Sequence, residues 1–309
     1  MMEKNWIYIF IAILSYICLG FLQVSIDYQR EIENLKSPIV LMPGEKAGSF
    51  ILSGFKGIAV DILWLEIEKS WHSGQHYKIL PSLKAISYLQ PNYTTVWEIG
   101  AWHMAYNIFA KEAERGRRLE RMFERMKEKM DFKENLGIIL EIEKGIKKIK
   151  EKIEREGLPE RENCEIIRKL KVYKSIIENL KKDTKNYSFL RIIDGIVESM
   201  LAQIFWYKSG IDFLKKGIVY NPDKYNLYFE LGWLYFDKGK DYKNAVKYLE
   251  KAIKFPHPEY VDDVLAHVYE KNGQIDKAIK QWEKLLDTNF REIAKKALRS
   301  LRKNGKFTP

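Results

Sequence analysis

Two histidines in the N-terminal third have a spacing that could bind a metal. His72 and His76 stand at i and i+4, which can place two imidazoles on one face of a helix. Gly74 between them suggests a turn, and no glutamate follows His72 as it does in the H-E-x-x-H zinc motif. No third ligand is evident. We therefore expect neither a metal nor any other cofactor.

Asp61 is the candidate for acid catalysis. It lies among Ile58, Ile62 and Trp64, so the pattern predicts a buried carboxylate. Burying a carboxylate alone is costly, so it must either pair with a neighbouring helix, which we favour, or act as a catalytic acid. The sequence has no Gly-rich phosphate loop and no Ser-His-Asp or Cys-His arrangement in a recognisable setting. We expect no enzyme activity and no small-molecule substrate.

The composition is that of a folded, helical protein. Of 309 residues, 46% are hydrophobic and 13% aromatic, too many for a mainly disordered chain, and Gly (18) and Pro (9) are scarce. The net charge of +11 comes from 53 basic and 42 acidic residues that interleave as on a solvated helical surface, so we expect no nucleic-acid partner. Cys18 and Cys164 are too few for a disulfide framework or a zinc site.

An apolar N-terminal segment predicts a membrane anchor. Residues 6–24 read WIYIFIAILSYICLGFLQV, close to the ~20 residues that cross a bilayer as a helix. A cleavable signal peptide is the main alternative, but no A-x-A-like site is present, and no small residue precedes Cys18 as it would in a lipidated cysteine. We predict a single-pass anchor in the cell (inner) membrane. Lys4 before the segment and Arg30 and Lys36 after it barely discriminate its orientation. A short cytoplasmic tail, which we favour, would put the bulk outside the cytoplasm.

The sequence after the anchor predicts paired helices. A first helix begins near Ser53, a second covers residues 77–89 and ends at Gln90-Pro91, and a third begins near Thr94. Helix, turn, helix and then L-x-P is typical of a tetratricopeptide repeat (TPR). A further helix is predicted over residues 209–220 before Asn221-Pro222.

The clearest repeat lies in the C-terminal third. Two stretches, residues 227–255 and 261–286, superimpose on each other. Equivalent small, aromatic and turn residues are Gly232 and Ala266, Tyr235 and Tyr269, Gly239 and Gly273, and Ala245 and Ala278. The first carries one extra residue near Lys240. Small residues let paired helices approach, tyrosines fill the space between them, and glycines make the turns. A last helix, residues 291–303, has Ile293, Leu298 and Leu301 on one side and is interpreted as a cap.

The middle of the chain departs from this pattern. Isoleucines recur at alternating steps of three and four in residues 139–153, and apolar residues do so again in residues 166–180, after the breaker Gly157-Leu158-Pro159. This spacing is typical of two long helices packed as an antiparallel hairpin. An elongated, irregular repeat is the alternative, and the sequence does not separate the two.

The chain resembles a group of bacterial membrane-anchored TPR proteins of uncharacterised function. The resemblance rests on GFKGIAVDILW (residues 54–64), on Leu89-Gln90-Pro91 followed by Trp97, on LGWLYFDKGKDYKNAVKYLEKAIKFP (231–256) and on QWEKLL (281–286). It covers residues 50–108 and 205–303, and nothing carries over to the stretch between them. The resemblance implies a fold, an anchor and the general TPR role of holding a peptide or partner domain in a concave groove, but no reaction.

The predicted fold is therefore all-α, with an N-terminal transmembrane helix and then a TPR-like α-solenoid that contains an inserted long helical hairpin. The predicted parts are the anchor, a juxtamembrane linker, the N-terminal TPR-like repeats, the hairpin insertion, and the C-terminal repeats with their cap: residues 1–28, 29–52, 53–108, 109–188 and 189–309.

One face of the first helix in each repeat lines a TPR groove, which gives the candidate binding residues. An aromatic group is followed by a polar patch: Trp102, Phe229, Trp233, Phe236, Tyr260, Asp263, His267 and Glu270. This order would suit a peptide with an apolar anchor and a basic or hydrogen-bonding end. Alternatively, the aromatic residues pack in the core against the insertion or the linker. The functions considered are a scaffold for a membrane-associated protein or peptide, a structural subunit of an envelope complex, and an enzyme acting on envelope precursors.

Overall fold

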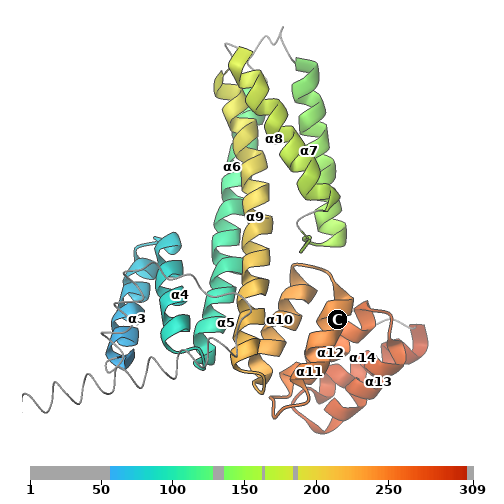
Figure 1. The fold of residues 1–309 in the computed structure, drawn as a ribbon. Helices are drawn as coiled ribbons and strands as arrows, with labels where there is room; N and C mark the ends of the chain where they lie inside the picture. The colour runs from blue at the N-terminus through green and yellow to red at the C-terminus, as the bar shows by residue number, and fades with distance from the viewer. Residues whose placement is uncertain (1–55, 128–135, 162–163, 184–186, 305–309) are drawn as a thin grey trace, which may run out of the picture. The chain divides into compact units, whose positions relative to one another are not determined.

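The computed structural model describes residues 56–127, 136–161, 164–183 and 187–304, and every regular element in these ranges is a helix (Figure 1). The chain divides into two compact units between Tyr93 and Thr94. The predicted anchor and linker lie outside the described residues. None of the described helices is long and apolar enough to cross a membrane.

The first unit contains a helical hairpin. α3 (Lys56–His72) packs on α4 (Ile79–Leu89), with the short helix η2 (His76–Lys78) between them. α4 ends at Leu89, and Gln90 caps it directly before Pro91. The buried side of α3 is formed by Val60 and Ile67. The apolar residues Ile58, Ile62 and Leu65 are exposed.

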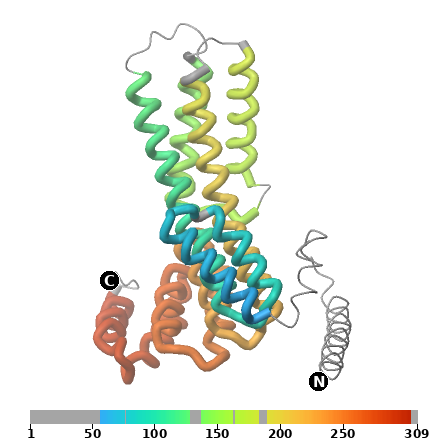
Figure 2. The backbone as a smooth tube through the Cα atoms, turned by 90° about the vertical axis from the view of Figure 1, so that its left-hand side faces the viewer, coloured from blue at the N-terminus to red at the C-terminus, as the bar shows by residue number. Residues whose placement is uncertain are grey.

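Two long helical paths form the centre of the second unit. In the first path, α5 (Thr94–Trp102), the π-helical segment η3 (His103–Ile108) and α6 (Phe109–Lys127) follow one another without a break. α9 (Tyr187–Tyr220), 34 residues long, is the second path and lies along the first (Figures 1 and 2). The helix predicted over residues 209–220 is therefore only the end of α9.

Trp97 packs α5 against the C-terminal end of α9. Its side chain is fully buried between Phe213, at a ring distance of 4.7 Å, and Tyr220, stacked at 5.9 Å. A Cβ at Gly217 would come within 2.7 Å of the indole, so glycine is needed for this close approach. α5 and the end of α9 thus pack together as a helical pair.

The part of the chain between η3 and the second half of α9 forms a four-helix bundle. α7 (Leu136–Glu156) and α8 (Glu165–Asp183) are the two helices that the isoleucine spacing predicted, and its seam residues Ile142, Ile146 and Ile177 are buried. Their partners include α6 and the first half of α9, which are continuous with repeat helices (Figure 2). The bundle is therefore a lengthened connection between two repeat helices, and the predicted boundary after residue 108 falls within a continuous helical path.

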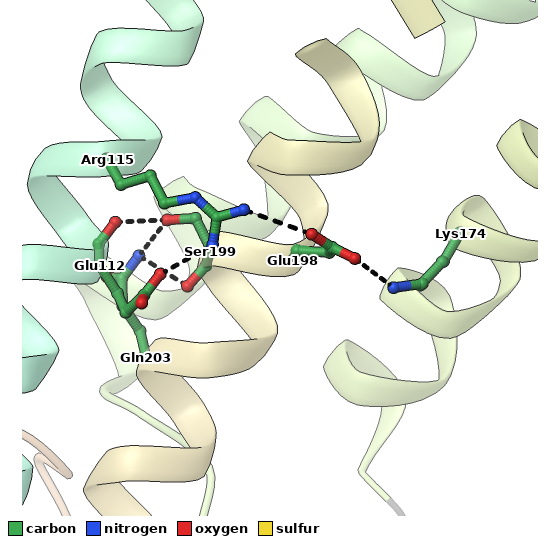
Figure 3. A network of polar contacts seen from close by, with 6 residues as sticks. All are labelled: Glu112, Arg115, Lys174, Glu198, Ser199 and Gln203. Atoms are coloured by element: carbon green, nitrogen blue, oxygen red, sulfur yellow. Dashed lines mark hydrogen bonds and ion pairs between the residues drawn. The ribbon is translucent and has the colours of Figure 1, made fainter. Parts of the chain in front are cut away.

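Polar contacts join α6, α8 and α9 at mid-bundle (Figure 3). Ser199 donates a hydrogen bond to the backbone oxygen of Glu112. The carboxylate of Glu198 accepts from Arg115 at 3.3 Å and from Lys174 at 2.6 Å, and the ammonium of Lys174 lowers the pKa of Glu198. One carboxylate thereby bridges two neighbouring helices.

Two further helical pairs and a cap complete the second unit. α10 (Tyr225–Asp237) pairs with α11 (Tyr242–Ala252), and α12 (Tyr260–Lys271) pairs with α13 (Ile275–Lys284). The short η4 (Leu285–Asp287) leads to α14 (Arg291–Asn304). α14 buries Leu298 and Leu301 as predicted, whereas Ile293 is 43% exposed.

The predicted small and aromatic positions have the expected packing roles. A Cβ at Gly232 would lie 2.8 Å from Leu249, so α10 and α11 approach closely there. Ala266 and Ala278 are fully buried. Tyr235 stacks on Tyr248 with a ring distance of 5.6 Å and fills the space between its pair of helices.

The two predicted turn glycines differ. Gly273 has a φ of +74°, as a tight turn after a helix requires. In the pair with one extra residue, Lys240 and not Gly239 takes the left-handed conformation, with a φ of +46°. Gly239 is instead needed for space, because a Cβ there would overlap the hydroxyl of Tyr207.

The loop after α7 docks on the turn between α10 and α11. The Leu158 N–H donates to the Lys238 carbonyl at 2.9 Å. Gly157 has a φ of +82°, and a Cβ there would overlap the carbonyl of Gly239. Glu160 accepts from Lys215 at 2.5 Å and from the Tyr235 hydroxyl at 2.9 Å. The breaker seen in the sequence thus makes a second contact between the bundle and the helical pair α10–α11, besides the continuous helices.

Candidate partner-binding surface

The first helices of three successive helical pairs bring the predicted aromatic residues close together. α5 with η3 contributes Trp102, α10 contributes Phe229 and Trp233, and α12 contributes Tyr260. The ring of Phe229 meets Tyr260 edge-on at 5.0 Å and stacks near Trp233 at 6.5 Å. Spacings of three and four residues place these side chains on one face of each helix.

The aromatic residues of this surface are not closed core. Trp102 is 45% exposed and Tyr260 is 39% exposed. Phe229, Trp233 and Phe236 are half-buried. Exposed aromatic residues next to half-buried ones are typical of surfaces that bind a partner.

Tyr106 links the aromatic residues of α5 and η3 to those of α10. Its ring stacks near Trp102 at 6.4 Å, and its hydroxyl donates to Asp237 at 3.0 Å. Burial raises the pKa of Tyr106, the Asp237 carboxylate raises it further, and a hydrogen bond with Trp233 acts in the opposite direction. Tyr106 is therefore a neutral phenol at physiological pH.

Two glutamates face each other among these rings. Glu98, one turn before Trp102 on α5, accepts a hydrogen bond from Asn226 of α10. Glu230 lies on α10 between Phe229 and Trp233 in sequence. Burial raises the pKa of Glu230 to about 7, with the negative charge of Glu98 adding to the effect, and burial also raises the pKa of Glu98. Two like-charged, partly desolvated carboxylates are a site where a bound cation would be stabilised.

We call the first helix of each pair its A helix. The A-helix surface is defined as the seven residues that these contacts connect: Glu98, Trp102, Tyr106, Phe229, Glu230, Trp233 and Tyr260. Both glutamates also raise the pKa of Tyr260, after its burial and its hydrogen bond with Tyr225. The carboxylates therefore lie within electrostatic reach of the aromatic residues on α12.

The polar residues predicted on α12 are engaged within the repeat. Glu270 accepts a hydrogen bond at 2.7 Å from the indole of Trp282, which is fully buried. His267 meets the same indole edge-on at 4.8 Å, and its Nε2 is 3.8 Å from Asp263. Burial raises the pKa of Asp263, and His267 counteracts this. These three residues border the A-helix surface and support its packing.

The structure places the remaining sequence candidates in the first compact unit, outside the helices that carry the A-helix surface. Asp61 is exposed, so the expectation of a buried carboxylate was wrong. α3 ends at His72, and Gly74 has a φ of +69°, so His72 and His76 do not share a helix. Among the described residues, no group of three or more His, Cys, Asp or Glu side chains could hold a metal.

Sequence reasoning missed Glu98, Tyr106 and Glu230. Laying the helices over one another with Trp102 on Trp233 makes Glu98 equivalent to Phe229 and Tyr106 equivalent to Asp237, each one turn from a tryptophan. The positions were therefore within reach. The contact between α5 and α10 that raises the pKa of Glu230 could not be predicted from the sequence.

Comparison with known families identifies one of the helical pairs. Residues 225–255 match the sequence model of the tetratricopeptide repeat family. The chain contains a TPR. The match covers α10 and α11, so the A-helix surface includes the first helix of the matched TPR. No curated protein matches the chain.

Replacing Glu230 by glutamine is expected to stabilise the TPR unit at pH 8. Between pH 4.5 and about 7 the folded protein holds a proton on Glu230 that the unfolded chain has lost, so stability falls as pH rises through this window. Glu230→Gln removes this loss and should increase the free energy of unfolding at pH 8 by about 1–3 kcal/mol, with little effect at pH 4.5. Urea unfolding at both pH values measures it. Glu114→Gln, at an exposed glutamate, is the control. An equal effect of both variants would contradict the assignment.

Proposed function

We propose that this chain is a membrane-anchored TPR scaffold whose A-helix surface binds a segment of a protein partner. TPRs in general mediate protein–protein interaction, and the matched repeat lies at the centre of this surface. The single observation that carries the proposal is the pair Glu98 and Glu230 set among partly exposed aromatic side chains. The proposal includes no catalytic step and no cofactor.

The chemistry of the surface suggests what the partner segment contains. A lysine or arginine side chain placed between Glu98 and Glu230 would relieve their mutual repulsion and their desolvation. Trp102 and Tyr260 on either side could stack on the same cation or on an adjacent aromatic or aliphatic residue. The expected ligand is therefore a peptide segment with a basic residue beside an apolar one.

The anchor proposal rests on residues 6–24. An anchor would confine the repeats to the membrane surface and raise their effective concentration near a membrane-associated partner. We propose the inner membrane, with the bulk of the chain outside the cytoplasm. A reporter enzyme fused to the C-terminus tests this orientation. Activity of a reporter that works only in the cytoplasm would contradict it.

A random-peptide phage library panned against the full-length chain in mild detergent tests the binding proposal. We expect enriched peptides to place lysine or arginine beside an aromatic or aliphatic residue. The Glu98→Gln/Glu230→Gln double variant should lose about tenfold or more in affinity for them, because it removes both negative charges. Glu114→Gln is again the matched control.

The stability measurement makes this test decisive. If urea unfolding shows that the Glu98→Gln/Glu230→Gln double variant is at least as stable as the parent at pH 8, its loss of binding cannot come from misfolding. Enriched peptides without basic residues would contradict the proposed ligand chemistry. Unchanged affinity in the double variant would remove Glu98 and Glu230 from the binding site.

One observation favours a second function, that of a structural subunit in a larger envelope complex. Ile58, Ile62 and Leu65 are 58%, 54% and 64% exposed, and their spacing places them on one face of α3. An exposed apolar row of this kind is typical of a surface that another chain covers. Light scattering of the full-length chain tests it: association that Ile62→Glu abolishes supports the second function, and a monodisperse monomer argues against it.

A further inference from the structure

A cavity of about 770 Å³ lies in the four-helix bundle, away from the A-helix surface. It is lined by α6, α7 and the first half of α9. Phe123 of α6, Ile146 of α7 and Ile193 and Ile196 of α9 form an apolar floor, and all four are buried. The volume falls within the ~300–1,000 Å³ typical of sites for small organic ligands.

The rim of this cavity is strongly basic. Of the charged residues that line it, six are basic and three are acidic. The basic residues recur every four positions on α6 and every three on α7: Arg117, Arg121, Arg125, Lys144, Lys147 and Lys150. These spacings set each row along one face of its helix. Cations therefore line both sides of the cavity.

The acidic residues of the rim neutralise only part of this charge. Glu143 is paired with Lys127, at 2.8 Å, and Glu120 with Lys150. Arg121 and Lys147 are exposed on opposite sides of the cavity. Burial lowers the pKa of Lys150, and the nearby charge of Arg117 lowers it further, against the effect of Glu154. A negatively charged group placed between the two basic rows would reduce the repulsion between Arg117 and Lys150.

We propose that the cavity binds an anionic single-chain amphiphile, with the acyl chain on the apolar floor and the carboxylate or phosphate head between Arg121 and Lys147. A neutral apolar ligand would leave the excess positive charge of the two basic rows without a partner. A compact anion without a chain would leave the floor of Phe123 and the isoleucines unfilled. Only a molecule with both parts matches both surfaces. This site is separate from the proposed peptide surface and does not depend on it.

Photo-crosslinking with a diazirine analogue of palmitate tests the proposal. The full-length chain is reconstituted in nanodiscs of neutral phosphatidylcholine, labelled, digested and mapped by mass spectrometry. We expect labelled peptides from α6, α7 and α9. Excess palmitate or lysophosphatidate should compete, whereas the uncharged alcohol hexadecanol should not. The stronger of the two anionic competitors shows whether the cavity prefers a carboxylate or a phosphate head.

Two variants and one control complete the test. Arg121→Glu/Lys147→Glu, at exposed positions, should weaken labelling about tenfold or more by reversing the charge on both sides. Ile193→Trp should block labelling by filling the floor. Arg118→Glu/Lys148→Glu makes the same charge change at exposed neighbours that do not line the cavity and should leave labelling unchanged. Labelling confined to other peptides, equal competition by hexadecanol, or equal loss in the control pair would overturn the proposal.

Discussion

Replacing Gly157 by alanine is expected to lower the free energy of unfolding by about 2–5 kcal/mol. The left-handed φ of +82° costs a non-glycine residue about 1–2 kcal/mol, and the new Cβ would overlap the backbone carbonyl of Gly239, which cannot move without shifting the turn between α10 and α11. The loop would have to leave its docking site. The hydrogen bond from Leu158 to Lys238 and the contacts of Glu160 would then be lost.

Two other glycines are matched controls for this prediction. Gly74 has a similar φ of +69° but nothing within 4 Å of a Cβ, so Gly74→Ala should show the conformational cost alone, about 1 kcal/mol. Gly137 lies in the first turn of α7 with open space around it, so Gly137→Ala should stabilise only slightly, by up to about 0.5 kcal/mol. Denaturant unfolding by circular dichroism measures all three. If Gly157→Ala costs no more than Gly74→Ala, the loop is not held against Gly239.

Replacing Trp282 by alanine is expected to cost about 3–5 kcal/mol, the usual range for a large aromatic residue in a core. Its side chain is fully buried, donates a hydrogen bond to Glu270 at 2.7 Å and meets the His267 ring at 4.8 Å. Removing it leaves a cavity between α12 and α13 and takes the hydrogen-bond donor from Glu270. Hydrogen exchange should show the largest loss of protection in these helices and in α14.

Trp102→Ala is the matched control for Trp282→Ala. Trp102 is 45% exposed, so its removal should change stability by less than about 1 kcal/mol while it weakens binding of the selected peptides. The two tryptophans thereby separate a role in the core from a role on the surface. Equal destabilisation by both substitutions would mean that Trp102 belongs to the core, as the alternative sequence interpretation had it.

Local features of this fold could be predicted because they depend on residues close in sequence. The spacing of small, aromatic and turn residues around Gly232 and Tyr235 predicted one TPR helix pair, and the isoleucine spacing predicted α7 and α8. These patterns arise from the helical period itself, so each helix could be recognised before its partner was known.

Contacts between distant residues could not be predicted in the same way. Glu98 and Asn226 are 128 positions apart, and the environment of Glu230 arises only when α5 and α10 pack together. Asp61 has the sequence neighbours of a buried residue, but α3 turns Val60 and Ile67 inward instead. Periodicity gives a helix a face but does not say which face the neighbouring helix will cover.

The residue pattern alone predicted an all-helical chain with a TPR and, from the apolar N-terminal segment, a membrane anchor. The packing of the helices was needed to show that the bundle continues α5 and the end of α9, that the loop at Gly157 contacts the turn at Gly239, and that Glu98 and Glu230 share one aromatic surface. The physical reason is range. Helix formation and turn chemistry act over a few residues, whereas burial, repulsion between carboxylates and the shape of a cavity depend on which helices meet.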